Sequence, residues 1–328
     1  TNGAYQQIPW AMYPDLMDVT RRETGIAIEG AFSAVWLFGQ KLANAAAPAV
    51  LGLTLAAAGW RESNAGAIVQ TDAALVTLQS AITEDRAAGF APLAIIGTAG
   101  SVGVGAYDDL NALADVAKAE TIWLHVDAAF GFWSRLAHAP WRALSDGIGR
   151  ADSIALDTHK WPGIQYDCGA CLVADRDLHR ATFSSRPPYL ESADAGLAGG
   201  DLWFCDYGIE LSRGFKALKV WTAIQTLGAD AMGAAITDNC KQAALMGDLV
   251  NASPHLTLQH PVISNLCCFS VAKGNVTRIA ADLQIAGKGV FSTITINETP
   301  CLRAAIVGHR TTSGDISAAI QAVEATQL

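Results

Sequence analysis

The stretch Asp157-Thr158-His159-Lys160-Trp161 follows an apolar run at residues 153–156 that has the character of a buried strand. A second such stretch, His125-Val126-Asp127-Ala128-Ala129, follows an apolar run at residues 121–124. The pattern predicts an aspartate and a lysine at the ends of two neighbouring strands, where an unpaired buried charge is costly. The arrangement becomes favourable if another molecule lies between the two side chains.

A molecule with an aldehyde for Lys160 and an aromatic ring nitrogen for Asp127 would satisfy both side chains, and pyridoxal phosphate carries both groups. The lysine must be deprotonated to form an imine, so burial and nearby positive charge would assist it. We expect His159 either to supply part of that charge or to contact the cofactor phosphate. Asp127 would keep the pyridine nitrogen protonated, and Ala129 is small enough to lie flat against the ring.

A glycine-rich turn, Gly100-Ser101-Val102-Gly103-Val104-Gly105, follows another predicted strand at residues 92–98. Its free backbone N–H groups and the Ser101 hydroxyl would suit an anion or a cofactor oxygen. Taken singly, each of these features is more often a loop, a cap or a solvated strand end. Their order along the chain is what favours a cofactor site.

The composition restricts the class of protein. The 328-residue chain is 51% hydrophobic and 16% charged, so it can bury a large core. Its formal net charge of −9 argues against a nucleic-acid or anionic-membrane surface. The first residues lack the pattern of a secretory signal, and the uncharged residues 42–60 favour a buried helix over a membrane span.

The seven cysteines are scattered, which suits reduced thiols in a cytoplasmic enzyme better than a disulfide framework. Cys168-Gly-Ala-Cys171 has the spacing of a metal or redox pair. It lies inside an apolar run at residues 168–174, however, and no second cysteine or histidine pair accompanies it. We therefore interpret it as part of a buried strand and predict no metal site.

From about residue 70 the chain alternates helical and strand patterns in the manner of an α/β protein. We expect a helix capped by Asp108, with Leu110, Leu113, Ala114 and Ala117 on its inward face. Other helices are expected at residues 72–87, 208–227, 229–251 and from Ser313, and the strand at residues 168–174 should return antiparallel. The expected domains are an incomplete N-terminal start at 1–60, a large cofactor-binding domain at 61–227 and a small α+β domain at 228–328.

Together these residues resemble a known family, the group II pyridoxal-phosphate-dependent amino-acid decarboxylases, which include aromatic-L-amino-acid and glutamate decarboxylases. The resemblance covers about three quarters of the chain and rests on the two stretches above together with further motifs. These motifs are Gly100-Ser-Val with Asp108, Tyr166-Asp-Cys-Gly-Ala, Pro188-Tyr189-Leu190, Glu210-Leu-Ser-Arg213 and Lys216-Ala-Leu-Lys-Val-Trp221. It implies the aspartate-aminotransferase fold (fold type I), with a mostly parallel central sheet.

The resemblance also implies roles for single residues. Lys160 would form the internal aldimine, Asp127 would pair with the pyridinium, Ala129 would contact the ring and His159 would lie near the phosphate. Tyr189 matches a mobile-loop tyrosine that returns a proton after carbon dioxide leaves. Relatives with phenylalanine at that position tend to be aldehyde synthases.

Two further implications concern the surface. The family implies a homodimer, with the Tyr189 loop reaching the neighbouring subunit's site. Arg213 matches an arginine of a linking helix, although a solvated helix face explains that residue equally well.

The sequence departs from the family pattern in two places. Val102 stands where the family usually has a threonine. No histidine precedes His125, so the family's ring-stacking histidine has no match, and neither does its glycine/serine-rich phosphate turn. Three explanations stay open: the sequence omits segments of the natural protein, the protein has lost them, or other residues replace them.

The function expected from these residues is decarboxylation of an L-amino acid to the amine and carbon dioxide, with pyridoxal phosphate as cofactor. The alternatives are another reaction on the same fold, by an aldehyde synthase, aminotransferase or lyase, and a non-catalytic paralogue that acts as a binding subunit. The expected partners are the amino-acid substrate and a second copy of the chain, with neither nucleic acid nor membrane. Aromatic, acidic and diamino-acid decarboxylases share these motifs, so the substrate stays open.

Overall fold

The computed structural model of the chain describes residues 72–184 and 203–327, with residues 193, 195–196 and 199–200 between them. All of these belong to one compact unit, Ser63–Leu328. The predicted helix at residues 42–60 and Tyr189 both lie outside the described residues. Within the described ranges, no helix combines the length and the apolar character needed to cross a membrane.

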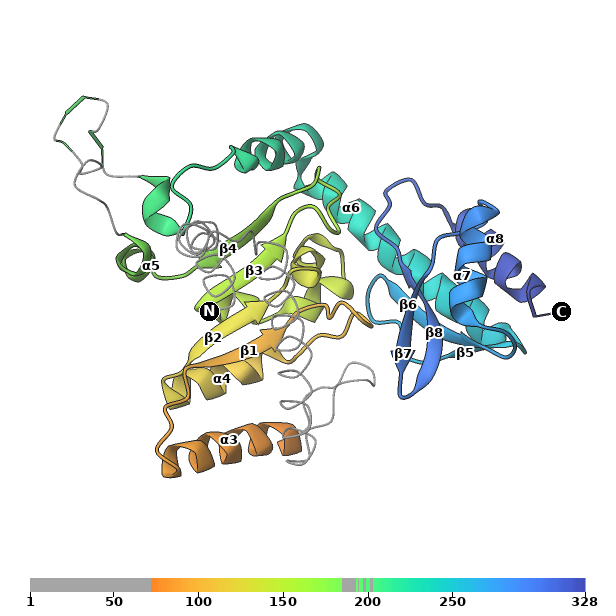
Figure 1. Cartoon of the computed structure of the whole chain (residues 1–328), viewed down its shortest axis with the longest axis horizontal. Helices are drawn as coiled ribbons and strands as arrows, with labels where there is room; N and C mark the ends of the chain where they lie inside the picture. Colours follow the sequence, from red (N-terminus) through yellow and green to blue (C-terminus); the bar gives the residue numbers. More distant parts are fainter. Residues whose placement is uncertain (1–71, 185–192, 194, 197–198, 201–202, 328) are drawn as a thin grey trace, which may run out of the picture. The chain divides into compact units, whose positions relative to one another are not determined.

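The first sheet has four strands in the order β1-β2-β3-β4 (Figure 1). Their bounds are β1 (Ala94–Thr98), β2 (Trp123–Asp127), β3 (Ser153–Asp157) and β4 (Gly169–Val173). The first three strands are parallel, and β4 returns antiparallel to β3 as expected. The α/β class with a mostly parallel sheet is therefore confirmed.

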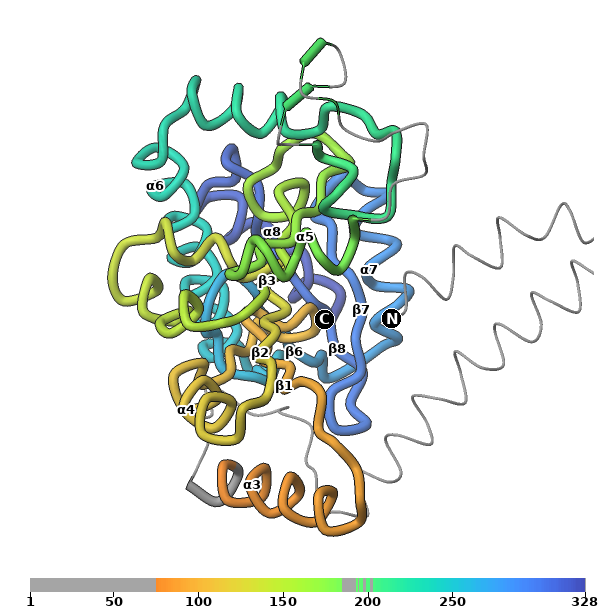
Figure 2. The backbone as a smooth tube through the Cα atoms, turned by 90° about the vertical axis from the view of Figure 1, so that its left-hand side faces the viewer, coloured from red at the N-terminus to blue at the C-terminus, as the bar shows by residue number. Residues whose placement is uncertain are grey.

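Two helices lie in layers on one face of this sheet (Figures 1 and 2). The helix α4 (Leu110–Glu120) packs against β1 and β2, and α3 (Asp72–Ala87) packs outside α4. The apolar side chains of α4 recur at helical spacing, so they share the face that meets the sheet. Its buried residues are Leu110, Leu113, Ala114, Val116 and Ala117, which confirms the predicted inward face.

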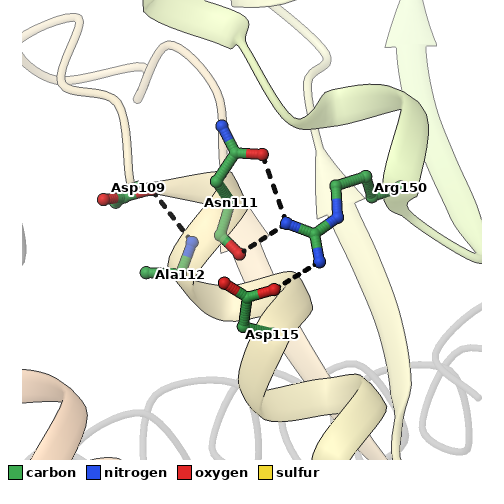
Figure 3. Close-up of polar contacts among 5 residues, drawn as sticks. All are labelled: Asp109, Asn111, Ala112, Asp115 and Arg150. Carbon is green, nitrogen blue, oxygen red and sulfur yellow. Dashed lines mark hydrogen bonds and ion pairs between the residues drawn. The ribbon is translucent and has the colours of Figure 1, made fainter.

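The helix α4 begins one residue later than the sequence suggested. Its cap is Asp109, whose side chain accepts a hydrogen bond from the Ala112 N–H at 3.0 Å (Figure 3). Asp108 does not cap the helix, because its carboxylate is occupied by the Thr98 N–H, 2.7 Å away at the end of β1. Asp108 and Asp109 thus fix the end of β1 and the start of α4 together.

Three 3-10 helices connect β2 to β3: η1 (Gly131–Leu136), η2 (Trp141–Ser145) and η3 (Ile148–Arg150). Arg150 joins η3 to α4 by donating to the Asn111 carbonyl and pairing with Asp115 (Figure 3). At the start of η1 only glycine fits, because a Cβ on Gly131 would lie 2.4 Å from the Ala99 carbonyl oxygen.

After β4 the chain forms α5 (Arg176–Phe183), η5 (Phe204–Tyr207) and the long helix α6 (Lys216–Ala252). The first residue of the helix predicted at 208–227 was wrong, because α6 begins at Lys216. Gly208 and Gly214 in the preceding residues disfavour a helix there. The predicted boundary between two helices survives as a break at Gly228, which has φ 78°.

The C-terminal part is an antiparallel sheet in the order β5-β6-β8-β7, formed by β5 (Leu256–Leu258), β6 (Leu266–Val271), β7 (Ser292–Ile296) and β8 (Thr299–Ala305). The helices α7 (Val276–Ile285) and α8 (Ser313–Ala325) and the second half of α6 share a buried core with it. This α+β character agrees with the expectation, while the exact domain boundaries stay a prediction.

The strand predicted at residues 168–174 is present, but its burial was wrong. Every residue of β4 is exposed or half-exposed, because β4 is the edge strand of the sheet as described. Of its two cysteines, Cys168 precedes the strand and is buried, whereas Cys171 is exposed, and both are free thiols.

Candidate functional site

Three parallel strands bring the predicted site residues to one edge of the first sheet. Thr98 at the end of β1 lies beside Asp127 at the end of β2, and Asp127 lies beside Ala155 of β3. The glycine turn (residues 100–105) follows β1, and Lys160 follows β3. Since ligands of such sheets bind beyond the carboxyl ends of parallel strands, these residues form the candidate site.

Asp127 presents an exposed carboxylate at this edge. One of its oxygens, Oδ1, accepts a hydrogen bond from the Ala129 N–H at 3.1 Å. The Ala129 carbonyl in turn accepts the Asp157 N–H at 3.3 Å, so the residues that follow β2 and β3 are joined. Among the described residues Oδ2 of Asp127 has no recorded partner, which leaves it available to an external donor.

Lys160 is paired with a carboxylate, but not with Asp127. Its Nζ lies 2.7 Å from Oδ2 of Asp157, and the two side chains are 39% and 20% exposed. From the sequence we expected a buried lysine beside positive charge, and the structure instead places an anion next to a half-exposed amine. The ion pair holds Nζ beside Asp157, the last residue of β3.

The imidazole of His159 is fixed by the backbone of a neighbouring loop. The Cys168 N–H donates to Nδ1 at 3.1 Å, and the ring packs edge-to-face against Tyr166 with centroids 4.7 Å apart. Because Nδ1 is the acceptor, a neutral imidazole carries its hydrogen on Nε2. His159 therefore presents an N–H donor at Nε2, which favours contact with an anion among its two predicted roles.

The loop that supports His159 is itself tied to α6. Nζ of Lys216 lies 2.7 Å from Oδ2 of Asp167, and Nζ of Lys219 donates to the Asp167 carbonyl at 2.7 Å. The hydrogen bond from Lys216 lowers the pKa of the Asp167 carboxyl, and the same contact raises the pKa of Lys216. Both side chains are exposed, so water screens this pair strongly.

Two tryptophans support the segment around Lys160, and neither was assigned a role from the sequence. Trp161 is 2% exposed, stacks on Phe130 with centroids 5.6 Å apart and donates from Nε1 to Asn239 at 3.1 Å. Trp133 donates from Nε1 to the Asp157 carbonyl at 2.8 Å. The signal available in the sequence was the position of Trp161, a large aromatic residue directly after Lys160.

The glycine turn is closed by its own hydrogen bonds. The N–H groups of Gly100 and Ser101 both donate to the Ala106 carbonyl, at 3.0 and 2.8 Å. The Ser101 hydroxyl accepts the Ala106 N–H at 3.0 Å and so keeps its own hydrogen available. Ser101 therefore offers a hydroxyl donor on a turn that follows β1.

One predicted residue, Tyr189, lies outside the described residues, and a second, Arg213, is not part of this group. Arg213 precedes α6 and is not on it; its guanidinium donates to the Phe204 carbonyl and lies 5.9 Å from the Phe204 ring centroid. Arg213 thus holds η5 and makes no recorded contact with Lys160 or Asp127.

Comparison with protein families gives two matches. The model described as the pyridoxal-dependent decarboxylase conserved domain matches residues 67–272. A second model, described as MFS/sugar transport protein, matches residues 2–84, nearly all of which lie outside the described residues.

Curated relatives agree with the first match. The aromatic-L-amino-acid decarboxylase of Bacillus atrophaeus is 30% identical over 249 residues, which are 73% of this chain and 52% of that protein. The histidine decarboxylase of Mus musculus is 31% identical over 73% of this chain and 36% of that protein. The phenylacetaldehyde synthase of Arabidopsis thaliana is 32% identical over 59% of this chain and 39% of that protein. This chain thus spans about half or less of the length of these relatives.

Solved structures confirm the expected fold. The crystal structure of Oryza sativa TDC with PLP and tryptamine superposes with a TM-score of 0.70 at 24% identity, over 77% of this chain and 54% of that one. The glutamate decarboxylase domain of a Vibrio parahaemolyticus protein gives a TM-score of 0.64 at 22% identity, over 81% of this chain and 52% of that one.

Proposed function

We propose, because this chain belongs to the pyridoxal-dependent decarboxylase family, that it binds pyridoxal phosphate through Lys160 and releases the carboxyl group of an L-amino acid as carbon dioxide. The observation that carries the proposal is the placement of Asp127 and Lys160. They follow adjacent parallel strands, β2 and β3, at the edge where this type of sheet holds its ligands.

The donors and acceptors of the site fit the cofactor. Lys160 has a primary amine for the aldehyde, and Asp127 has a free carboxylate oxygen for a protonated ring nitrogen. Nε2 of His159 and the Ser101 hydroxyl are donors suited to phosphate or ring oxygens. When bound, pyridoxal phosphate supplies an aromatic ring that accepts electron density from the substrate's α-carbon.

Asp157 is placed to handle the proton of Lys160. In this structure the lysine is held as an ion pair, whereas attachment to an aldehyde requires the free amine. The Asp157 carboxylate, 2.7 Å from Nζ, is a base in direct contact with the proton that must leave. From the sequence we expected positive charge beside Lys160, and the structure has this carboxylate in its place.

Asp127 holds charge at the other end of the cofactor. A carboxylate paired with a protonated ring nitrogen keeps that proton in place throughout the reaction. The Ala129 N–H fixes the carboxylate orientation through Oδ1, and Oδ2, which has no recorded protein donor among the described residues, would be available to the ring nitrogen.

A second function is favoured by one specific observation, the 32% identity to a phenylacetaldehyde synthase. The two reactions differ in the step after loss of carbon dioxide. Return of a proton to carbon gives the amine, whereas oxidation by molecular oxygen followed by hydrolysis gives the aldehyde, with ammonia and hydrogen peroxide released. We favour the amine because Tyr189, by resemblance to the decarboxylases, is the proton donor. The remaining proposals from the resemblance are a homodimer with shared sites and a cytoplasmic location.

The proposal is tested by adding pyridoxal phosphate to the purified protein and recording its visible absorbance. We expect a new visible band that is absent in Lys160→Ala and unchanged in Lys118→Ala, an exposed lysine on α4. Carbon dioxide release from a panel of L-amino acids then identifies the substrate. A wild-type protein without the band, or a Lys160→Ala variant that keeps it, contradicts the proposal.

A further inference from the structure

The glycine turn is held from outside by the C-terminal sheet. The side chains of Val104 and Ala106, each 7% exposed, are buried in a small cluster with Cys268, Ile296 and Cys301. Those three residues lie on or at the end of β6, β7 and β8. The apolar side of the turn is thus packed against a sheet that follows it by more than 150 residues in the chain.

One charged residue of that sheet makes the polar contacts. Arg303 of β8 donates from Nε to the Gly103 carbonyl at 2.9 Å and from Nη2 to the Val102 carbonyl at 2.6 Å. Its third nitrogen, Nη1, donates to the Ser292 hydroxyl of β7 at 3.1 Å. The rigid fork of the guanidinium therefore binds two successive carbonyls of the turn at once.

Burial makes these contacts costly to lose. Arg303 is half-buried, and burial lowers the pKa of its guanidinium from the ordinary value. Its recorded partners within the described residues are the two carbonyls and one hydroxyl, none of them charged. Without Arg303 the carbonyls of Val102 and Gly103 would lose their strongest donor.

The contacts also set the direction of the N–H groups. In a trans peptide the N–H points opposite to the carbonyl of the same peptide unit. Carbonyls of Val102 and Gly103 that face Arg303 therefore direct the N–H groups of Gly103 and Val104 away from it. In the described part of the chain neither N–H donates to a recorded acceptor, so both are available donors on the turn that carries Ser101.

We propose that Arg303 is a positioning residue, which orients the glycine turn from the C-terminal sheet and thereby sets the affinity for pyridoxal phosphate. This inference rests on the proposed function for its ligand. It makes the C-terminal part of the chain a determinant of cofactor binding, although that part supplies no contact with Lys160 or Asp127 among the described residues.

The experiment compares three variants by titrating pyridoxal phosphate and following the visible band. Arg303→Met keeps the length of the side chain but has no donor, and we expect affinity to fall about 10- to 100-fold, as for loss of two charge-assisted hydrogen bonds. Arg303→Lys keeps the positive charge but loses the planar guanidinium that binds two carbonyls at once. Its affinity for pyridoxal phosphate should therefore lie between those of wild type and Arg303→Met. Ser292→Ala is the matched control: it removes the hydroxyl that Nη1 contacts and that donates to the Arg303 carbonyl, but it leaves both contacts to the turn in place. Its affinity should stay within about twofold of wild type.

Hydrogen exchange without cofactor gives a second and independent measurement. The N–H groups of Gly105 and Ala106 are hydrogen-bonded within the turn, so they report its order directly. In Arg303→Met we expect their exchange to accelerate about tenfold or more, while α4 and α8 exchange as in wild type. If exchange in Arg303→Met accelerates throughout the protein, the variant is generally unfolded, and Arg303→Lys then decides. Protection of the turn that is restored in Arg303→Lys supports the proposal, and protection that is not restored rejects it.

The two measurements separate the possible failures. Unchanged exchange with weakened affinity would show direct contact between Arg303 and the ligand and would overturn a positioning role. Unchanged exchange with unchanged affinity overturns the inference outright. If wild type itself gives no visible band, the proposed function fails, and the exchange data still decide whether Arg303 orders the turn.

Discussion

Single residues determine whether this site can work, and Asp127 is the clearest case. Its carboxylate is exposed, oriented by the Ala129 N–H and free at Oδ2 among the described residues. No other residue of β2 (Trp123–Asp127) has a carboxylate that could replace it opposite a protonated ring nitrogen.

Asp127→Asn should therefore retain the cofactor's attachment to Lys160 but lower the decarboxylation rate by about 100-fold or more, roughly 3 kcal/mol of transition-state stabilisation. Turnover of the best amino acid from the panel measures this. Asp115→Asn is the control, since Asp115 is exposed and pairs only with Arg150 in the described structure. An Asp127→Asn variant with a third or more of the wild-type rate would remove Asp127 from the mechanism.

We propose that the Tyr189 hydroxyl decides which product forms. Phenylalanine at this position lacks the hydroxyl that returns the proton, so Tyr189→Phe should lower the yield of amine and raise the yield of aldehyde. Product analysis by mass spectrometry gives the ratio. Tyr207→Phe removes a hydroxyl that contacts Arg176 at 3.1 Å and should leave the ratio unchanged. Equal ratios in Tyr189→Phe and wild type would exclude the hydroxyl as the proton donor.

The sequence located Asp127, Ala129, His159 and Lys160 correctly relative to the strands, because apolar runs end where these motifs begin. It did not reveal the partner of Lys160. Asp157 lies three residues earlier, and whether the two side chains meet depends on backbone angles after β3 that no periodicity reports. Arg303 could not be found either, because its contact with the glycine turn joins residues 200 apart in the chain.

At the scale of elements, the start of η1 packs closely against the backbone that follows β1. The N–H of Gly131 donates to the Ala99 carbonyl at 3.0 Å, just before the glycine turn. A Cβ at this position would lie 2.4 Å from that oxygen and 2.6 Å from the Ala99 carbonyl carbon, and both belong to backbone that cannot move aside easily.

Gly131→Ala should destabilise the protein by about 3 kcal/mol or more, because η1 must separate from the end of β1. Gly149→Ala is the matched control, since a Cβ there meets nothing within 4 Å, and it should change stability by less than about 0.5 kcal/mol. Thermal melting of both variants measures the difference. Equal melting temperatures would mean that the contact between Gly131 and Ala99 is not as close as described.

Elements with strong periodicity were predicted well, and irregular ones were not. The helix α3 has the predicted bounds, and the inward face of α4 is as expected. The start of α6 was placed eight residues too early, since the apolar spacing extends into residues that glycines keep out of a helix. Burial of β4 was also wrong, because an apolar strand pattern does not tell whether another element covers it.

On the scale of the whole molecule, the first half of α6 presents an apolar surface in the described structure. Phe215, Trp221 and Leu227 are 75%, 61% and 57% exposed, and an open groove of about 780 Å³ runs along residues 214–227. Large apolar side chains exposed in this number on one helix are typical of contacts between proteins. They support the proposed homodimer.

Trp221→Glu should therefore shift the protein from dimer to monomer, since it places a charge in an apolar contact. Light scattering after size-exclusion chromatography gives the mass. Ile285→Glu is the control, because Ile285 is 86% exposed and belongs to another helix, α7. A dimer that persists in Trp221→Glu, or a wild type that is a monomer, would place the contact elsewhere or remove it.

The proposed function depends most on covalent attachment at Lys160, and chemical trapping tests it directly. The protein is incubated with pyridoxal phosphate, reduced with borohydride and digested, and the modified lysine is located by mass spectrometry. We expect the modification on the peptide that contains Lys160, at about one equivalent per chain when the cofactor is stoichiometric. Modification spread over surface lysines such as Lys118, with none at Lys160, would contradict the proposed function.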